Sequence, residues 1–228
     1  APMNMTRILR HLYIIILLAS TLSSCREEGV DHEVDMTCTD IVTFAGNIDG
    51  RATFTFNKVD DSPEITLRAQ GMLNTGSIDE GSRMLIYYIP ENNEAYNSGN
   101  IYLRGGTPIT CSDINMTWRP EFDMWHNGKV YLYSTWRSGK YINVHVRLTY
   151  STEPRIFCLA VDPGTIDQKM PDVYLVHIIS EDVDYHDRAY YASFDISQLW
   201  SLPNVEGIRL HVANSNLDKQ IFTFAKPQ

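Results

Sequence analysis

The sequence predicts an all-β protein, a small barrel followed by a β-sandwich, from two features. Apolar and polar residues alternate with a period of two over most of the chain, and clusters of turn-forming residues separate the alternating segments. Clean alternation predicts half-buried antiparallel strands, and frequent turns are typical of all-β barrels and sandwiches. The clearest strands are expected at residues 51–56, 131–136 and 141–150, and the best helix candidate is the short segment 196–200.

The first 24 residues have the layout of a secretory signal peptide. Arg7 and Arg10 precede an apolar run from Leu12 to Ala19, and small hydroxylated residues follow it. The run is shorter than the roughly 20 apolar residues that a helix needs to cross a bilayer. We therefore expect export without a membrane-spanning helix.

The tetrapeptide at residues 22–25, which ends in Cys25, resembles the lipobox of bacterial lipoproteins. The resemblance implies that the Cys25 thiol receives diacylglycerol and that its new amino group is acylated after cleavage. Several acyl chains hold a protein firmly on a membrane, whereas a single chain anchors it only marginally. The alternative is an ordinary secretory peptide that has a cysteine near its end by chance.

The residues after Cys25 bear on the final location. Residue 26 is arginine, so the aspartate that retains lipoproteins in the inner membrane of enteric bacteria is absent, and delivery to the outer membrane is expected. The acidic pair Glu27-Glu28 resembles the tract that sends lipoproteins of Bacteroidetes to the cell surface, but it also suits a simple solvated tether. The cell surface and the periplasmic face both stay open.

The charge balance argues against nucleic acid as a partner. The chain has 19 Lys and Arg against 28 Asp and Glu, a formal charge of −9, and loss of residues 1–24 removes Arg7 and Arg10 and leaves −11. Phosphate backbones repel a protein of this charge. We therefore expect no nucleic-acid binding.

The cysteines predict no metal site of the zinc type. Cys38, Cys111 and Cys158 follow Cys25, and none belongs to a CxxC motif or to a Cys/His cluster. Three cysteines allow at most one internal disulfide, and the sequence does not choose the pair. We expect no bound cofactor.

Strand counts predict how the exported chain is divided. Five or so strands are expected between Asp40 and Thr110, enough for a small barrel, and roughly seven between Lys129 and Ala225, which suits a sandwich. The predicted division is a signal peptide at 1–24, a lipidated tether at 25–37, a barrel domain at 38–112 and a sandwich domain at 113–228.

Several segments resemble NigD-like lipoproteins of Bacteroides and its relatives. They are the Gly-x-Arg strand at residues 81–89, the hairpin at 136–143 and the strands at 172–177 and 191–196. The resemblance covers nearly the whole chain after the signal peptide. It implies an N-terminal OB-fold followed by a C-terminal β-sandwich, supplies no catalytic residue, and suggests a bacteriocin-related role in immunity or secretion.

The acidic segment 181–187 is the one candidate metal site. Asp182, Asp184 and His186 would face the same way in an extended loop, and such oxygen-rich clusters suit calcium. The segment lacks the glycine and the terminal glutamate of an EF-hand loop, however, so a solvated acidic turn between two strands is the alternative.

Aromatic side chains concentrate in the middle of the chain and are the candidate ligand-binding residues. Aromatic faces stack on sugar rings, and OB-folds hold oligosaccharides or oligonucleotides on one sheet face. Tyr and Trp also supply binding energy at protein interfaces, and many of these residues are expected to fill the two cores. The candidates are Tyr87, Tyr88, Trp118, Trp125 and Trp136.

These observations favour a lipid-anchored, non-enzymatic envelope protein that binds a protein partner. The alternative is a surface lipoprotein that binds glycans through its aromatic residues. A hydrolase is the least supported function, because no serine elbow, HExxH motif or distinctive carboxylate pair occurs in the sequence.

Overall fold

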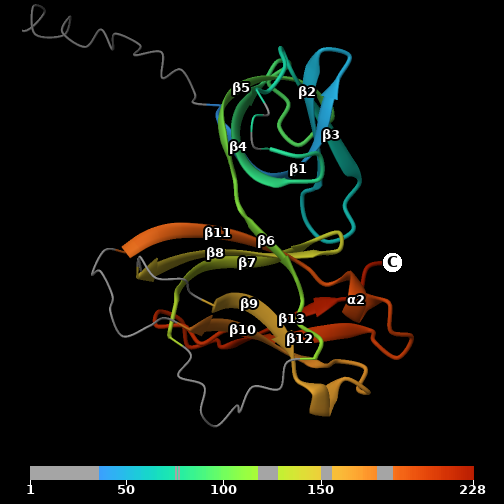
Figure 1. The fold of residues 1–228 in the computed structure, drawn as a ribbon, viewed down its shortest axis with the longest axis vertical. Helices are drawn as coiled ribbons and strands as arrows, with labels where there is room; N and C mark the ends of the chain where they lie inside the picture. The colour runs from blue at the N-terminus through green and yellow to red at the C-terminus, as the bar shows by residue number, and fades with distance from the viewer. Residues whose placement is uncertain (1–35, 75, 77, 118–127, 150–155, 179–186) are drawn as a thin grey trace, which may run out of the picture. The chain divides into compact units, whose positions relative to one another are not determined.

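β-Strands make up most of the described chain, as the alternating pattern predicts (Figure 1). The computed structural model describes residues 36–74, 76, 78–117, 128–149, 156–178 and 187–228. The strands are β1 (Cys38–Ile48), β2 (Arg51–Asn57), β3 (Glu64–Ala69), β4 (Arg83–Pro90), β5 (Gly99–Pro108), β6 (Thr110–Asp113), β7 (Tyr131–Ser138), β8 (Tyr141–Thr149), β9 (Ile156–Val161), β10 (Asp172–Ile178), β11 (Asp187–Asp195), β12 (Gly207–His211) and β13 (Ile221–Ala225). Within these described ranges, helical structure is limited to the single turns η2 (Pro163–Thr165) and α2 (Ser197–Trp200), and α2 confirms the predicted helix.

Strands β1 to β5 close into a barrel in the order β1-β2-β3-β5-β4. Neighbouring strands are antiparallel except β3 and β5, which pair in parallel. A five-stranded closed barrel of this kind is the architecture of an OB-fold. The predicted OB-like barrel is therefore confirmed, and Figure 1 shows its strands curling around a common interior.

The barrel interior is filled by alternate side chains of its strands. Phe44 and Phe54 are almost fully buried there, with ring centroids 5.7 Å apart. β1 bulges between Phe44 and Gly46, where φ is +109°. This backbone conformation favours glycine, and a Cβ on Gly46 would also displace the exposed Glu80 side chain, whose Oε1 would lie 2.5 Å away.

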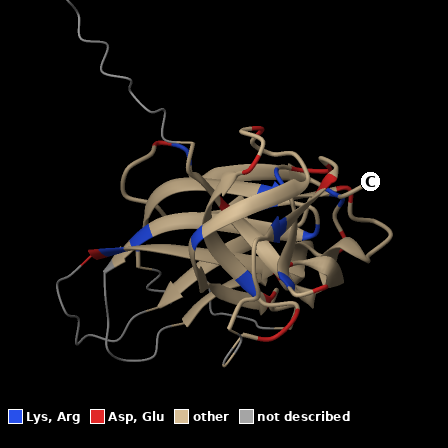
Figure 2. Cartoon of the chain, turned by 90° about the horizontal axis from the view of Figure 1, so that it is seen from above, with Lys and Arg blue, Asp and Glu red and all other residues tan. Residues whose placement is uncertain are grey.

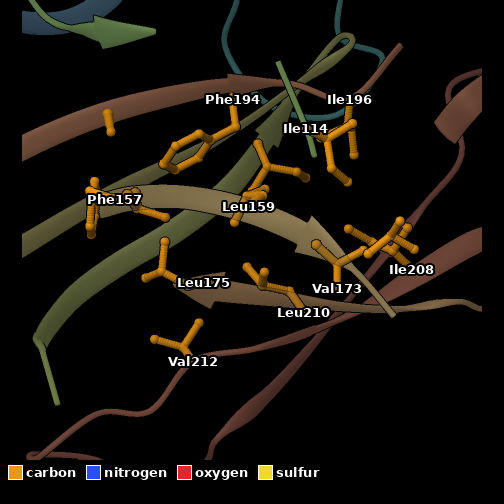
Figure 3. Packing of buried hydrophobic residues seen from close by; sticks show 14 of the residues in the cluster. Ile114, Phe157, Leu159, Val173, Leu175, Phe194, Ile196, Ile208, Leu210 and Val212 are labelled. Atoms are coloured by element: carbon orange, nitrogen blue, oxygen red, sulfur yellow. The ribbon is translucent and has the colours of Figure 1, made fainter. Parts of the chain in front are cut away.

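The remaining strands form a two-layered β-sandwich, as predicted. One sheet has the order β6-β11-β8-β7 and the other β13-β12-β10-β9. Figure 3 shows Phe194 of β11 pointing across the core toward Phe157 of β9, with ring centroids 5.8 Å apart. Leu159, Val173 and Leu210 extend this core and are shielded from solvent.

Strand β6 crosses the predicted domain boundary between residues 112 and 113. It follows the barrel strand β5 directly and pairs in parallel with β11 of the sandwich. The division of the exported chain into a domain at 38–112 and a domain at 113–228 stays a prediction.

Two further expectations concern the described residues. No helix among them is long and apolar enough to cross a bilayer. Cys38, Cys111 and Cys158 are all free thiols, so no pair of these three forms a disulfide.

Candidate functional site

The outer surface of the barrel meets the sandwich sheet β6-β11-β8-β7 along strands β1 and β4. Ile41 and Leu85 face away from the barrel interior, since their neighbours Val42, Met84 and Ile86 belong to the barrel core. Both are nevertheless buried, with 5% and 4% of their surface exposed. Apolar contacts therefore continue from the barrel onto the sandwich.

Arg83 of β4 connects the two sheets by hydrogen bonds. Its Nε donates to Oγ of Ser193 at 3.0 Å, and its Nη2 donates to Oδ1 of Asn143 at 3.2 Å. Its Nη1 donates to Oγ1 of Thr43 on β1 at 3.0 Å, and its guanidinium lies 4.2 Å from the ring centroid of Tyr141. Arg83 therefore joins β1 and β4 of the barrel to β8 and β11 of the sandwich.

Arg137 of β7 makes a second connection, to the turn between β2 and β3. Its Nη1 and Nη2 donate to the two carboxylate oxygens of Asp61 at 2.8 and 2.9 Å. The backbone N–H of Asp60 donates to the Arg137 carbonyl at 2.8 Å, and the N–H of Gly139 donates to the Asp60 carbonyl at 2.9 Å. The turn and the β7–β8 hairpin are thus joined through both side chains and backbone.

Between these connections lies a cavity of about 510 Å³, which we call the junction groove. This volume is within the range typical of small-molecule and peptide sites. Its walls come from β1, the end of β2 and β4 on the barrel side, and from β7 and β11 on the sandwich side. Prominent lining residues are Thr39, Phe56, Lys58, Leu85, Trp136 and Tyr191.

A buried carboxylate, Asp40, forms one end of the junction groove. The Lys58 ammonium donates to its Oδ1 at 2.6 Å, and the Tyr88 hydroxyl donates to its Oδ2 at 2.9 Å. Burial and the Asp40 charge raise the pKa of Tyr88, so this phenol stays a neutral donor. Lys58 also lies 3.9 Å from the ring centroid of Tyr96. Both charged groups of the groove are therefore held by neighbouring side chains.

An aromatic stack, consisting of Tyr133, His145 and Tyr191, continues the sandwich wall of the groove. The His145 ring lies 4.0 Å from that of Tyr191 at an interplanar angle of 11°, and 4.5 Å from that of Tyr133 at 29°. His145 pairs with Tyr191 across β8 and β11, and a bulge in β7 brings Tyr133 to its other side. The stack is half-buried, and Tyr133 is its most exposed member at 47%.

His145 predicts a pH dependence of stability. Burial lowers the pKa of its imidazole from 6.5. The unfolded chain therefore binds a proton more readily than the folded chain, and the folded state loses stability as the pH falls from about 6.5 to the lower native pKa. The loss is complete below that native pKa.

Replacement His145→Gln should remove this part of the pH dependence. We expect the urea midpoint of the wild type to fall more between pH 7.5 and 5.5 than that of the variant. His211→Gln is the control for removal of a histidine outside the stack, one that is bonded to Asp172, and it should leave the His145 contribution in place. Equal falls in the wild type and His145→Gln would contradict the assignment.

The structure places the predicted aromatic candidates in different surroundings. Trp136 lines the junction groove. Tyr87 pairs with the lining residue Thr39 and has 39% of its surface exposed, so it stands at the groove edge. Tyr88 lies inside the barrel with none of its surface exposed, so its ring is not available to a ligand and its hydroxyl holds Asp40 instead.

The other candidates lie outside the described residues. These are the lipidation site Cys25, the aromatic residues Trp118 and Trp125, and the candidate metal ligands Asp182, Asp184 and His186. In the described ranges, no group of three or more His, Cys, Asp or Glu side chains is arranged to hold a metal ion.

Sequence reasoning did not single out Tyr191, Asp40 or Lys58. Tyr191 becomes part of the groove only because β11 pairs with β8, and Asp40 meets Lys58 only because the barrel closes. The sequence signal for this region was its aromatic residues, of which Trp136 lines the groove and Tyr87 stands at its edge.

The fold of most of the chain is shared with solved structures from the Bacteroidales. A protein of unknown function from Bacteroides vulgatus is 20% identical with a TM-score of 0.64, and the match covers 84% of this chain and 92% of that one. A NigD-like immunity protein from Bacteroides caccae is 16% identical with a TM-score of 0.57, covering 82% and 91%. This chain has the fold of a NigD-like protein.

A candidate lipoprotein from Bacteroides fragilis has the same fold. It is 13% identical with a TM-score of 0.56, and the match covers 84% of this chain and 98% of the other. The predicted resemblance to NigD-like proteins is thus confirmed at the level of fold. No protein-family model and no curated protein matches the chain in sequence.

Proposed function

We propose that this protein is a lipid-anchored protein of the cell envelope that binds another polypeptide in the junction groove. The observation that carries the proposal is the half-buried stack of Tyr133, His145 and Tyr191 beside a cavity of about 510 Å³. Tyrosine and tryptophan are enriched among the residues that supply most of the energy at protein interfaces. The groove has both, together with a lysine.

The geometry of the stack favours a polypeptide over a glycan. A sugar ring packs on a free aromatic face, but both faces of His145 are covered by its two tyrosine neighbours, and one face of Tyr191 is covered by His145. The stack therefore leaves a ligand only the outer faces of Tyr133 and Tyr191, together with the ring edges, which carry the tyrosine hydroxyls. Edges of this kind suit the mixed apolar and hydrogen-bonding surface of a polypeptide.

The charged groups of the groove suit binding better than catalysis. A general acid donates a proton to the substrate and a general base accepts one, so the group must be within reach of the substrate. Both carboxylate oxygens of Asp40 are instead occupied by hydrogen bonds from Lys58 and Tyr88. Lys58 is in turn held by Asp40 and the Tyr96 ring. These contacts fix the wall of the groove and leave the ligand to be held by stacking, hydroxyl and apolar contacts.

The location rests on the sequence and on the proteins that share the fold. The lipobox predicts acylation at Cys25, and a protein of the same fold is described as a candidate lipoprotein. Another is called a NigD-like immunity protein, so a secreted toxin or an envelope component that presents a chain segment to the groove is the partner we propose. The outer membrane is the expected site of anchoring.

Replacement Tyr133→Ala should break the complex with this partner. The processed lipoprotein would be purified from detergent-solubilised membranes, and its bound polypeptide identified and titrated back. We expect at least a tenfold weaker complex, the loss that corresponds to about 1.4 kcal/mol at an interface. The cause would be the loss of the most exposed ring of the stack.

Tyr102→Ala is the matched control for the loss of an exposed tyrosine. Tyr102 lies on β5, has 39% of its surface exposed, and belongs neither to the lining residues of the groove nor to the aromatic stack beside it. This variant should bind like the wild type. Equal losses in the two variants would show that the groove is not the binding surface.

A glycan-binding role is the second candidate, and Tyr87 and Trp136 are the residues that favour it. Tyr87 is 39% exposed beside the groove, and Trp136 lines it. Retention on a glycan array that is lost in Tyr87→Ala and kept in Tyr102→Ala would favour this role over a polypeptide partner.

A further inference from the structure

A second cavity, of about 350 Å³, lies where the Arg83 side chain passes between the barrel and the sandwich. We call it the Arg83 pocket. It is separate from the aromatic stack, although Phe56 and Asn57 line both this pocket and the junction groove. Lys140, Tyr141 and Glu64 stand around it.

Arg83 is a buried cation without a direct counter-ion among the described residues. Only 3% of its surface is exposed, and its acceptors Ser193, Thr43 and Asn143 are all neutral. Burial lowers the pKa of Arg83 to about 10, which still leaves the guanidinium charged at neutral pH. A buried charge with neutral partners alone is costly, so a nearby anion would be stabilising.

The carboxylate of Asp195 does not fill this place. It is bound to the Lys140 ammonium at 2.6 Å and accepts hydrogen bonds from Ser197. It forms no ion pair with Arg83 and acts on it only at longer range. The acid that acts on Arg83 is thus already paired with Lys140 at the pocket edge.

The hydrogen bonds around Arg83 leave donors in excess. A guanidinium has five N–H groups, and three of those of Arg83 find an acceptor in the described part of the chain. Asn143 is fully buried, and its Oδ1 accepts from both Arg83 and Ser193. These two bonds fix the amide orientation, and its Nδ2 has no partner among the described residues. The network lacks an acceptor.

The distribution of basic and acidic residues in the described chain also favours an anion near Arg83. Figure 2 shows basic positions along the strands and acidic positions mainly in the connecting loops. The described arginines, Arg83 among them, all lie on strands, whereas Lys140 lies in the turn between β7 and β8. Glu64 begins β3 at the pocket edge and is exposed. Glu64 is the one lining residue whose charge opposes an anion.

We propose that the Arg83 pocket binds a carboxylate, which would accept from Arg83 and be attracted by Lys140. Arginine suits this ligand because its fork of N–H groups matches the two oxygens of a carboxylate. The carboxylate belongs either to a free small acid or to an acidic residue of a polypeptide. The inference stands on the pocket alone and does not depend on the function proposed above.

The test follows the Arg83 side-chain Nε–H signal by NMR in the detergent-solubilised full chain, labelled with ¹⁵N-arginine. We expect acetate to shift this signal saturably and uncharged acetamide at the same concentrations to leave it in place. Lys140→Met should weaken acetate binding by about fivefold, the order expected for one partly exposed charge. Glu64→Gln should tighten it.

Lys169→Met is the matched control for removal of a lysine. Lys169 pairs with Glu206 at 2.6 Å, as Lys140 pairs with Asp195, but it lies outside the pocket. It should leave acetate binding unchanged. Thermal melts of the Glu64→Gln and Lys140→Met variants check that both fold.

Two outcomes would overturn the proposal. One is the absence of a saturable acetate shift, and the other is a shift that acetamide reproduces or that both rim variants leave unchanged. If acetate binds, an end-blocked pentapeptide with a central aspartate, compared with its asparagine counterpart, identifies the source. Tighter binding of the aspartate peptide than of acetate assigns the carboxylate to a polypeptide, and equal or weaker binding assigns it to a free acid.

Discussion

Replacement Asp61→Ala should destabilise the protein by about 2–3 kcal/mol, whereas replacement Arg137→Met should cost only about 1 kcal/mol. The difference comes from where the remaining partner lies. Arg137 has 2% of its side chain exposed, and without Asp61 its charge keeps only the Gly139 carbonyl and Asp60 at 3.6 Å, too long for a hydrogen bond. We expect a smaller loss than the 3–5 kcal/mol typical of a broken buried pair. The Asp61 side chain is 39% exposed, so in the variant water can reach the guanidinium of Arg137 from that direction.

Arg137→Met leaves a different partner behind. The carboxylate of Asp61 turns into water, and an apolar side chain of similar length fills the space of the guanidinium. Urea unfolding at pH 7 measures both variants, and Asp61→Asn, which keeps one acceptor, should lie between them. If Arg137→Met were the more damaging change, packing around Arg137 and not its charge would join the turn to the β7–β8 hairpin.

Replacement of either core phenylalanine, Phe54→Ala in the barrel or Phe194→Ala in the sandwich, should cost about 3–5 kcal/mol. Both side chains have none of their surface exposed, and each packs near another phenylalanine. We also expect both variants to unfold in one transition. The reason is that Arg83 and Arg137 connect the barrel and the sandwich through several side-chain hydrogen bonds.

Circular dichroism and tryptophan fluorescence, followed along the same urea series, measure this cooperativity. Coincident curves with a lowered midpoint are the expected result for both variants. Tyr102→Ala serves as the surface control and should change stability by less than about 0.5 kcal/mol. Two separate transitions, one shifted by Phe54→Ala and the other by Phe194→Ala, would show that the barrel and the sandwich fold independently.

The fold class could be predicted because its signals are local. Alternation at residues 51–56, 131–136 and 141–150 reports which side chains of a strand are buried, and this information lies in neighbouring positions. The strand counts then limited the architecture to a small barrel and a sandwich. The resemblance to NigD-like proteins added the OB type of the barrel, and the strand order agrees with it.

The junction groove could not be predicted, because it depends on contacts between distant segments. Arg83 reaches Ser193 across 110 positions of sequence, and nothing near either residue indicates the other. The position of Tyr88 was missed for another reason. Residues 84–89 are all apolar or aromatic, so their sequence did not show which of them face the barrel interior, and Tyr88 does. Its neighbour Tyr87 faces the other way.

Site-specific photo-crosslinking on cells tests the central claim, that the junction groove binds a polypeptide, most directly. A benzophenone amino acid would replace Tyr133 in one strain and Tyr102 in another, with the lipoprotein otherwise unchanged, and adducts would be identified after irradiation. We predict a single discrete polypeptide adduct from position 133 and none from position 102. No adduct from position 133, or the same adducts from both positions, would contradict the account.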